Sequence, residues 1–241
     1  MAGGGSKAAV YAAIGANSFV TVIKFIGFAM TGSGAMLSEA IHSLADVGTQ
    51  SLLAFGMVRA KKPADAKHPF GYGLEAFVWA LISAVGIFFV GCGFSIMHAI
   101  EAISESIMGE AHHLEISMLA IGILVVSLII EGASLGVAIY GLAKDAKKQG
   151  MGLATYVRTT DDPFGVAVLF EDGAAVLGVI FALTAVVLTQ VTGNPIWDAM
   201  GTLAVGILLG VVAIWLIQKN RVFLVGRAIS DKDQARVAAV L

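Results

Sequence analysis

The residues with the clearest chemical potential lie in the segment SEAIHSLADVGTQ, at positions 38–50, inside a long apolar stretch. His42 and Asp46 are four residues apart, so on a helix they share one face. Imidazole and carboxylate are ligands for zinc, and also for iron, cobalt, nickel or manganese. A later apolar stretch carries an acidic pair, Glu171 and Asp172. These residue types and this spacing predict a divalent-metal site between two helices.

A structural interpretation competes with this one, because His42 and Asp46 could serve only as hydrogen-bonding groups between packed helices. A charged side chain at the centre of a bilayer costs at least ~2.5 kcal/mol on insertion scales. A His and Asp pair level with an acidic pair on another helix favours the functional interpretation. Lys24 and Glu39 are interpreted as a structural ion pair or as side chains that reach the interface. For Glu131, a proton relay and a polar contact between helices both stay open.

The composition places the whole chain in a membrane. Of 241 residues, 58% are hydrophobic and 13% charged, with a mean hydropathy of +0.88. Soluble domains average roughly 45–50% apolar and about 25% charged residues. The net charge of -2 gives no basic field for a nucleic-acid partner, and the single Cys92 cannot form an intramolecular disulfide. The sequence shows no nucleophile–base pair and no phosphate-binding motif that would indicate an enzyme.

Continuous apolar runs, rather than alternating ones, predict an all-α membrane protein. About 20 apolar residues span a bilayer. The chain contains six such segments, so we expect a six-transmembrane-helix bundle within a domain at 1–220, followed by a cytoplasmic segment at 221–241. The expected spans are residues 8–30, 34–58, 75–100, 115–142, 163–189 and 197–218.

The positive charges set the orientation. Lys24 lies inside the first span, and the other fourteen of the 15 Lys and Arg residues lie in the N-terminus, the second-to-third connection, the fourth-to-fifth connection or the C-terminus. By the positive-inside rule both termini are cytoplasmic. We expect a multi-pass integral membrane protein of the bacterial cell inner membrane, with the lipid bilayer as its partner.

The same topology sets the depth of the candidate ligands. At 1.5 Å per residue, His42 lies roughly 12 Å and Asp46 roughly 18 Å below the outer edge. Glu171 lies roughly 12 Å from the inner edge, or about 18 Å from the outer edge of a ~30 Å core. His42, Asp46 and Glu171 are therefore predicted to converge near the midplane.

Two longer segments, GAMLSEAIHSLADVGTQ and KHPFGYGLEAF, resemble the cation diffusion facilitator family of metal/proton antiporters. The likeness covers nearly the whole chain. It implies a six-helix bundle that works as a homodimer by alternating access, with zinc or a similar ion bound between the second and fifth spans. The transported metal is then the substrate, and no prosthetic group is expected.

The fifth span departs from the common family pattern, in which two ligands are four residues apart. Ala167 and Val168 stand four residues before Glu171 and Asp172. The segment FEDGAAVLG, like TGNPIWDAMGTLAVGILLG, is similar to the branch with the animal mitochondrial zinc transporters. Adjacent helical residues point ~100° apart. We therefore predict Glu171 as a ligand and Asp172 as a supporting or alternating group.

Two further departures concern the loop and the end of the chain. Many relatives hold a second metal site in the second-to-third connection, made of an Asp and two His. Asp65 and His68 match it, but Tyr72 stands in place of the second His, so a stable second site is doubtful. Most relatives continue into a cytoplasmic metal-binding domain. This chain ends at Leu241, as a truncated protein or one that lacks the domain.

The predicted function is efflux of a divalent metal, zinc first, in exchange for protons, because the ligands bind metal only when deprotonated. The alternatives are a metal channel or uniporter without proton coupling, and a structural membrane subunit that transports nothing.

Overall fold

The computed structural model describes residues 4–31, 34–108, 118–226 and 238. Within these ranges, the side chains of 4–9, 28, 30–31, 34–39, 41–42 and 119–120 are not described, so His42 and Glu39 are placed by their backbone alone. All the regular structure in the described part is helical, which confirms the predicted all-α bundle.

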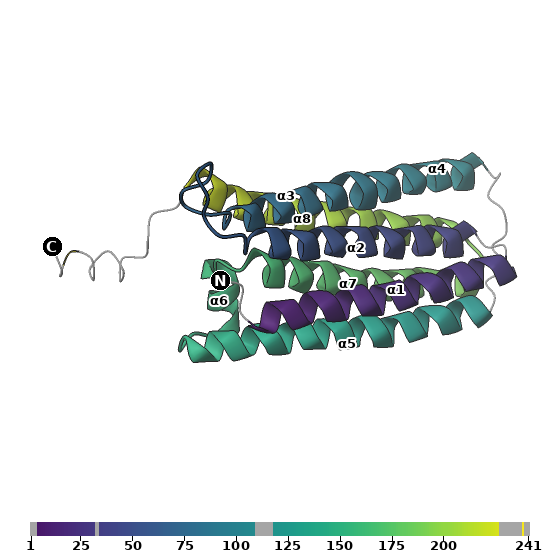
Figure 1. Ribbon diagram of the computed structural model, residues 1–241. Coiled ribbons are helices and arrows are strands. Elements are labelled where there is room, and N and C mark those ends of the chain that lie inside the picture. Colours follow the sequence, from purple (N-terminus) through teal and green to yellow (C-terminus); the bar gives the residue numbers. More distant parts are fainter. Residues whose placement is uncertain (1–3, 32–33, 109–117, 227–237, 239–241) are drawn as a thin grey trace.

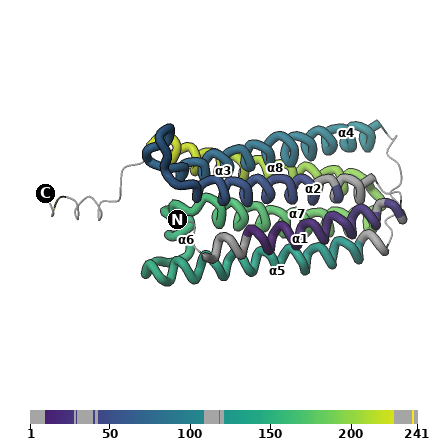
Figure 2. The backbone as a smooth tube through the Cα atoms, in the orientation of Figure 1, coloured from purple at the N-terminus to yellow at the C-terminus, as the bar shows by residue number. Residues whose placement is uncertain are grey.

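Six long rods make the bundle (Figure 1). The third rod is a single unit built from three consecutive helical segments, α3, η1 and α4, which follow one another without a break (Figure 2). A short helix, α6, which the sequence did not predict, joins α5 to α7. The bounds are α1 Gly4–Thr31, α2 Gly34–Arg59, α3 Glu75–Gly86, η1 Ile87–Gly93, α4 Phe94–Met108, α5 Met118–Lys148, α6 Leu153–Thr159, α7 Pro163–Thr192 and α8 Ile196–Val225.

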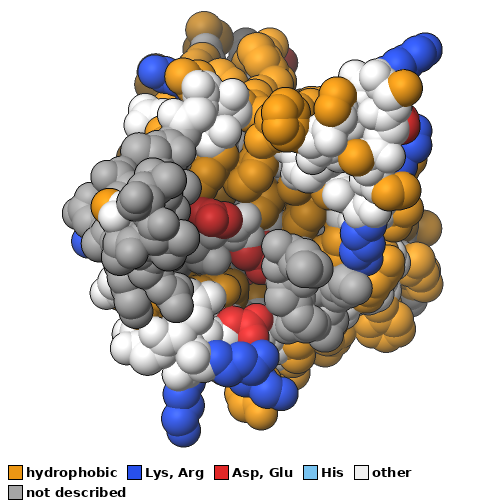
Figure 3. Space-filling model, turned by 60° about the vertical axis from the view of Figure 1, so that its left-hand side comes forward, with side chains coloured by type: hydrophobic (Ala, Val, Ile, Leu, Met, Phe, Trp, Pro, Cys, Tyr) orange, Lys and Arg blue, Asp and Glu red, His pale blue; other side chains and the backbone are white. Residues whose placement is uncertain are grey.

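The rods alternate in direction. The start of α1 and the ends of α2, α5 and α8 lie at one end of the bundle (Figure 1). The blue Lys and Arg side chains surround this end in Figure 3, and red carboxylates lie nearer its middle. The described basic residues outside α1 all belong to elements or connections at this end: Arg59, Lys61, Lys62, Lys67, Lys144, Lys147, Lys148, Arg158, Lys219 and Arg221.

Five helical stretches in the described part of the chain are long and apolar enough to cross a membrane: Val10–Gly27, Glu75–Met108, Ile121–Lys148, Pro163–Thr192 and Ile196–Val225. The protein is thus a multi-pass integral membrane protein. Helix α2 is 26 residues long and packs between α1 and α3, but it is not among the five. Its side chains are described only at Ala40 and from Ser43 to Arg59, so the five stretches do not test whether α2 crosses the membrane.

The ends of α7 follow from local sequence. Asp162 precedes the helix, and its Oδ1 accepts a hydrogen bond of 3.2 Å from the backbone N–H of Gly165. Pro163 occupies the first turn, where its missing N–H is not needed. Gly193 ends the helix with a φ of 68°, a left-handed conformation that glycine adopts without strain. Asp162 and Gly193 thereby fix the segment that presents the acidic pair.

The third rod contains a π-helix, η1, with the sequence IFFVGCG. The sequence did not predict this π-helix, since the apolar pattern is continuous through the third span. It packs closely on α8: a Cβ added at Gly210 would lie 2.9 Å from Cys92 Sγ, and one added at Gly91 would lie 3.1 Å from Leu209 Cδ1. Small residues therefore let the π-helix and α8 approach each other.

Candidate metal-transport site

Asp172 on α7 is held by two other helices. Gln50 on α2 donates from Nε2 to Asp172 Oδ1 at 3.2 Å, and Ser134 on α5 donates from its hydroxyl to Oδ2 at 2.6 Å. Asn17 on α1 in turn donates from Nδ2 to Gln50 Oε1 at 3.1 Å. All four side chains are buried. Each oxygen of the Asp172 carboxylate thus has a donor from the protein, which fixes its orientation.

Glu171 faces a different neighbour, as expected for adjacent residues on a helix. The hydroxyl of Ser83 on α3 lies 3.2 Å from Glu171 Oε1 and 3.3 Å from the carbonyl oxygen of Thr49, so its one hydrogen can go to either acceptor. Glu171 Oε2 is buried and has no hydrogen-bond partner among the described residues. An isolated buried carboxylate oxygen is costly, so this atom favours a proton or a cation beside it.

Asp46 lies on α2, one turn before Gln50. Its carboxyl is near enough for its charge to act on both Glu171 and Asp172. The side chain of His42 lies outside the described residues, so its predicted place beside Asp46 is not tested. Among the described side chains, no group of three His, Cys, Asp or Glu is close enough to hold a metal. Asp46, Glu171 and Asp172 are thus neighbours, but the described side chains do not form a complete set of metal ligands.

A second buried polar cluster joins α1, α2 and α5. Lys24 Nζ donates to Ser43 Oγ at 2.8 Å and lies 3.5 Å from Glu131 Oε1. The side chains of Lys24 and Glu131 are 1% and 4% exposed, so the lysine is fully enclosed and does not reach the interface. The sequence left either an ion pair or a position at the membrane interface open for Lys24, and the structure shows an ion pair. The structure supplies Glu131 as its partner, whereas the Glu39 side chain lies outside the described residues. Glu131 therefore makes a polar contact between helices.

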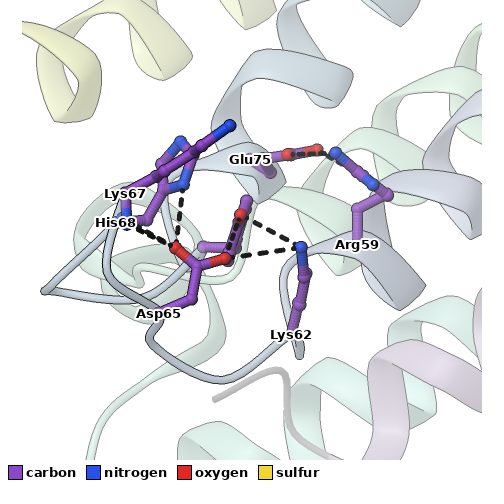
Figure 4. Close-up of polar contacts among 7 residues, drawn as sticks. Arg59, Lys62, Asp65, Lys67, His68 and Glu75 are labelled. Carbon is purple, nitrogen blue, oxygen red and sulfur yellow. Dashed lines mark hydrogen bonds and ion pairs between the residues drawn. The ribbon is translucent and has the colours of Figure 1, made fainter.

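The connection between α2 and α3 holds the other ligand-type residues (Figure 4). The Asp65 carboxylate accepts from the Tyr72 hydroxyl at 2.7 Å and from the backbone N–H groups of Lys67 and His68 at 3.0 and 2.8 Å. His68 Nδ1 lies 3.4 Å from the same carboxylate, and Lys62 donates to Tyr72 Oη at 3.0 Å. The Tyr72 hydroxyl, followed by the His68 N–H, holds the pKa of Asp65 well below its usual range.

This loop is closed by its own side chains. Arg59 and Glu75 join its two ends through hydrogen bonds of 3.0 and 2.8 Å. Both oxygens of Asp65 already accept hydrogen bonds within the loop, so they are not open for a metal. The doubt that the sequence raised about a second site here has a physical basis in the structure.

Three residues at the centre were missed by the sequence analysis: Gln50, Ser83 and Ser134. Ser and Gln are common in membrane helices as packing groups, so their type alone gives no signal. Their positions do: Ser134 follows Glu131 by three residues and Gln50 follows Asp46 by four, which puts each on the face of an ionisable neighbour. Ser83 has no such neighbour, and only the packing of α3 identifies it.

Comparison with known proteins agrees with this architecture. Residues 10–225 match the family described as the cation efflux transmembrane domain. Metal tolerance protein C4 of Arabidopsis thaliana is 43% identical over 236 residues, which cover 98% of this chain and 50% of the plant protein. The human mitochondrial protein named proton-coupled zinc antiporter SLC30A9 is 42% identical over 234 residues, covering 96% of this chain and 40% of that protein.

The expected likeness to the animal mitochondrial branch is confirmed, and the plant protein is similar to the same degree. The chain spans half or less of the length of these two relatives. An uncharacterized transporter of Methanocaldococcus jannaschii is 24% identical over 212 residues. The related proteins are transporters rather than enzymes, and for them a metal ion is substrate rather than resident cofactor. With a match that extends through every long helix, the chain belongs to the cation efflux, or cation diffusion facilitator, family of membrane transporters.

Proposed function

We propose that this protein exports a divalent metal, zinc first, in exchange for protons, through a site formed by His42, Asp46 and Glu171. Asp172 supports this site or alternates with Glu171. One observation carries the proposal: Glu171 Oε2 is buried in the bundle without a partner among the described residues, beside the charges of Asp46 and Asp172. Carboxylates gathered in a low-dielectric interior repel one another unless a cation or protons join them.

The exchange follows from competition for the same atoms. A carboxylate or imidazole ligand must lose its proton to bind metal, and it takes a proton when the metal leaves. The hydrogen bonds from Gln50 and Ser134 keep Asp172 oriented through this change, and Ser83 holds one oxygen of Glu171. Export is then driven by a proton gradient directed the opposite way. The name of the human relative describes this type of exchange, which supports carrying it over to this chain.

The topology belongs to the same proposal. Six crossings, with α2 as the second, would leave both termini on the side that carries the basic residues, which the positive-inside rule identifies as cytoplasmic. That the protein forms a homodimer and works by alternating access is carried over from the family resemblance. A bacterial inner membrane is the proposed location, and a fractionation of cells that express the tagged chain tests it, since two of the relatives are mitochondrial or plant proteins.

The test is a metal-selectivity panel in proteoliposomes with an imposed pH gradient. Zinc, manganese, cobalt and iron are offered in turn, and internal metal and internal pH are followed together. We expect saturable zinc uptake with proton movement in the opposite direction. Saturable uptake that moves no protons would favour a uniporter or channel. No uptake of any of the four metals would favour the structural-subunit alternative.

A further inference from the structure

Two hydrogen bonds define how α1 and α2 lie against each other. Asn17 is bonded to Gln50, and Lys24 is bonded to Ser43. From the first pair to the second, the chain advances seven residues on α1 and goes back seven residues on α2, as antiparallel helices in one register require. Seven residues are two turns, or roughly 10.5 Å. Asp46 lies between Ser43 and Gln50 on α2, so the predicted metal site lies between the two pairs.

The Lys24 pair is the charged one. It is displaced from the Gln50 pair toward the end of the bundle where α1 joins α2, the end without described Lys or Arg residues outside α1. Lys24 is the one Lys or Arg within the six predicted spans. Its partner Glu131 precedes Ser134 by three residues on α5, and Ser134 donates to Asp172. The ion pair is thus linked through α2 and α5 to the residues on both sides of the candidate site.

The buried centre combines carboxylates with one ammonium group. Asp46, Glu171, Asp172 and Glu131 are acidic, and the charges of Asp46 and Glu131 both act on Asp172. Without Lys24, Glu131 would be a further carboxylate within electrostatic reach of a bound cation. With Lys24 at 3.5 Å, it already has a cation beside it. A charge on Lys24 also repels a metal held less than two turns away, and at an effective dielectric near 20 this repulsion is worth roughly a tenfold change in affinity or more.

We propose that Lys24 is a tethered cation that keeps Glu131 out of the set of carboxylates open to the transported metal, and so limits the centre to one divalent ion. The inference rests on the proposed function, because it assumes a cation bound at Asp46 and Glu171. It makes Lys24 and Glu131 determinants of metal affinity and stoichiometry that act without touching the metal. It also predicts that the two residues have opposite effects, which a purely structural ion pair would not have.

The test is calorimetric zinc titration of the purified full chain in detergent at fixed pH, with wild type, K24Q, E131Q and the K24Q/E131Q double variant. K24Q removes the positive charge beside Glu131, so zinc should bind roughly tenfold tighter or with a second equivalent. E131Q removes a negative charge beside the ammonium, so zinc should bind roughly tenfold weaker. The double variant should return to within about threefold of wild type with one equivalent.

Two controls separate charge from packing. K24R keeps the positive charge and should retain one zinc equivalent. Thr21→Val alters a buried residue one turn from Lys24 whose hydroxyl donates within α1, to the carbonyl oxygen of Asn17, so zinc binding should not change. If E131Q does not fold, K24Q and the double variant still carry the comparison, since both remove the buried ammonium.

The outcomes distinguish this inference from the function beneath it. If wild-type protein binds zinc but the zinc affinities of K24Q and E131Q shift in the same direction, or neither shifts, the tethered-cation role alone is overturned. A K24Q variant that keeps one equivalent and wild-type affinity also overturns it. Wild-type protein that binds no zinc overturns the proposed function and this inference together.

Discussion

Two acidic regions of this protein contain ligand-type residues, and they differ in what their oxygens already bind. In the loop between α2 and α3, Asp65 accepts hydrogen bonds at both oxygens from the loop itself. In the bundle, Glu171 keeps one buried oxygen without a partner among the described residues. The loop is exposed to solvent, and the bundle centre is not. The difference teaches that a ligand-type residue is informative only together with what its oxygens already bind, because Asp65 is satisfied by its own loop whereas Glu171 has an oxygen left for the proposed cation.

The largest effect should come from the ligands of the bundle centre. Replacing Asp46 or His42 by Ala removes a predicted metal ligand from the second helix, and we expect zinc transport in proteoliposomes to be abolished. The protein should stay folded, as judged by size-exclusion elution and thermal unfolding. Transport within a few-fold of wild type by both variants would show that the centre does not bind the substrate through α2.

A smaller, graded effect should separate the two acids of α7. Glu171→Gln removes the carboxylate that has an open oxygen, whereas Asp172→Asn alters a group already fixed by Gln50 and Ser134. We expect the larger loss of zinc affinity from Glu171→Gln. Asp172→Asn should cost about 10–100-fold, as is typical for residues that orient a ligand. Zinc titration of both variants at fixed pH decides, and the reverse order would make Asp172 the ligand.

The smallest effect on transport should come from the loop. Tyr72→Phe removes the donor that most strongly lowers the pKa of Asp65, so that pKa should rise toward its ordinary value. A carboxyl with a depressed folded-state pKa stabilises the fold above its unfolded pKa and loses this contribution as pH falls through the folded value. As the pH is lowered, the variant should therefore lose loop order at a higher pH than wild type. An NMR titration of Asp65 measures this difference.

Zinc transport at neutral pH should stay within about twofold of wild type in Tyr72→Phe. A matched variant, Lys62→Met, removes the cation that donates to the Tyr72 hydroxyl and should behave in the same way. If either change reduces transport as strongly as Asp46→Ala does, the loop is part of the transport site and the contrast between the two regions fails.

Much of the bundle could be predicted from sequence because its signals are long and redundant. Apolar runs of about 20 residues and the one-sided distribution of Lys and Arg predicted the long helices and their alternation. The observed ends extend further, to Lys148 in α5 and Val225 in α8, because helices continue beyond the apolar core. The short α6 and the π-helix were missed, since neither changes the apolar periodicity by which helices are found.

The candidate centre was predictable only in its ionisable members. Asp46, Glu171 and Asp172 stand out because charge is rare in apolar spans, and the structure brings their charges within reach of one another. The residues that hold them do not stand out. Ser83 binds Glu171 across 88 positions of sequence, and Ser134 binds Asp172 across 38. Such contacts depend on the rotation of each helix about its axis, which periodicity leaves undetermined in spans that are apolar on all sides.

The π-helix at Ile87–Gly93 has a consequence for how this chain should be aligned with its relatives. A π-turn takes up about one residue more than an α-turn, so the halves of the rod on either side are offset by that residue. Ser83 belongs to the half that meets Glu171, whereas Ile96, in the half beyond the π-helix, meets Gly206 of α8. For a relative without the π-turn, a one-residue gap between 87 and 93 would keep both halves matched. Gaps placed elsewhere in the span would pair residues that face different helices.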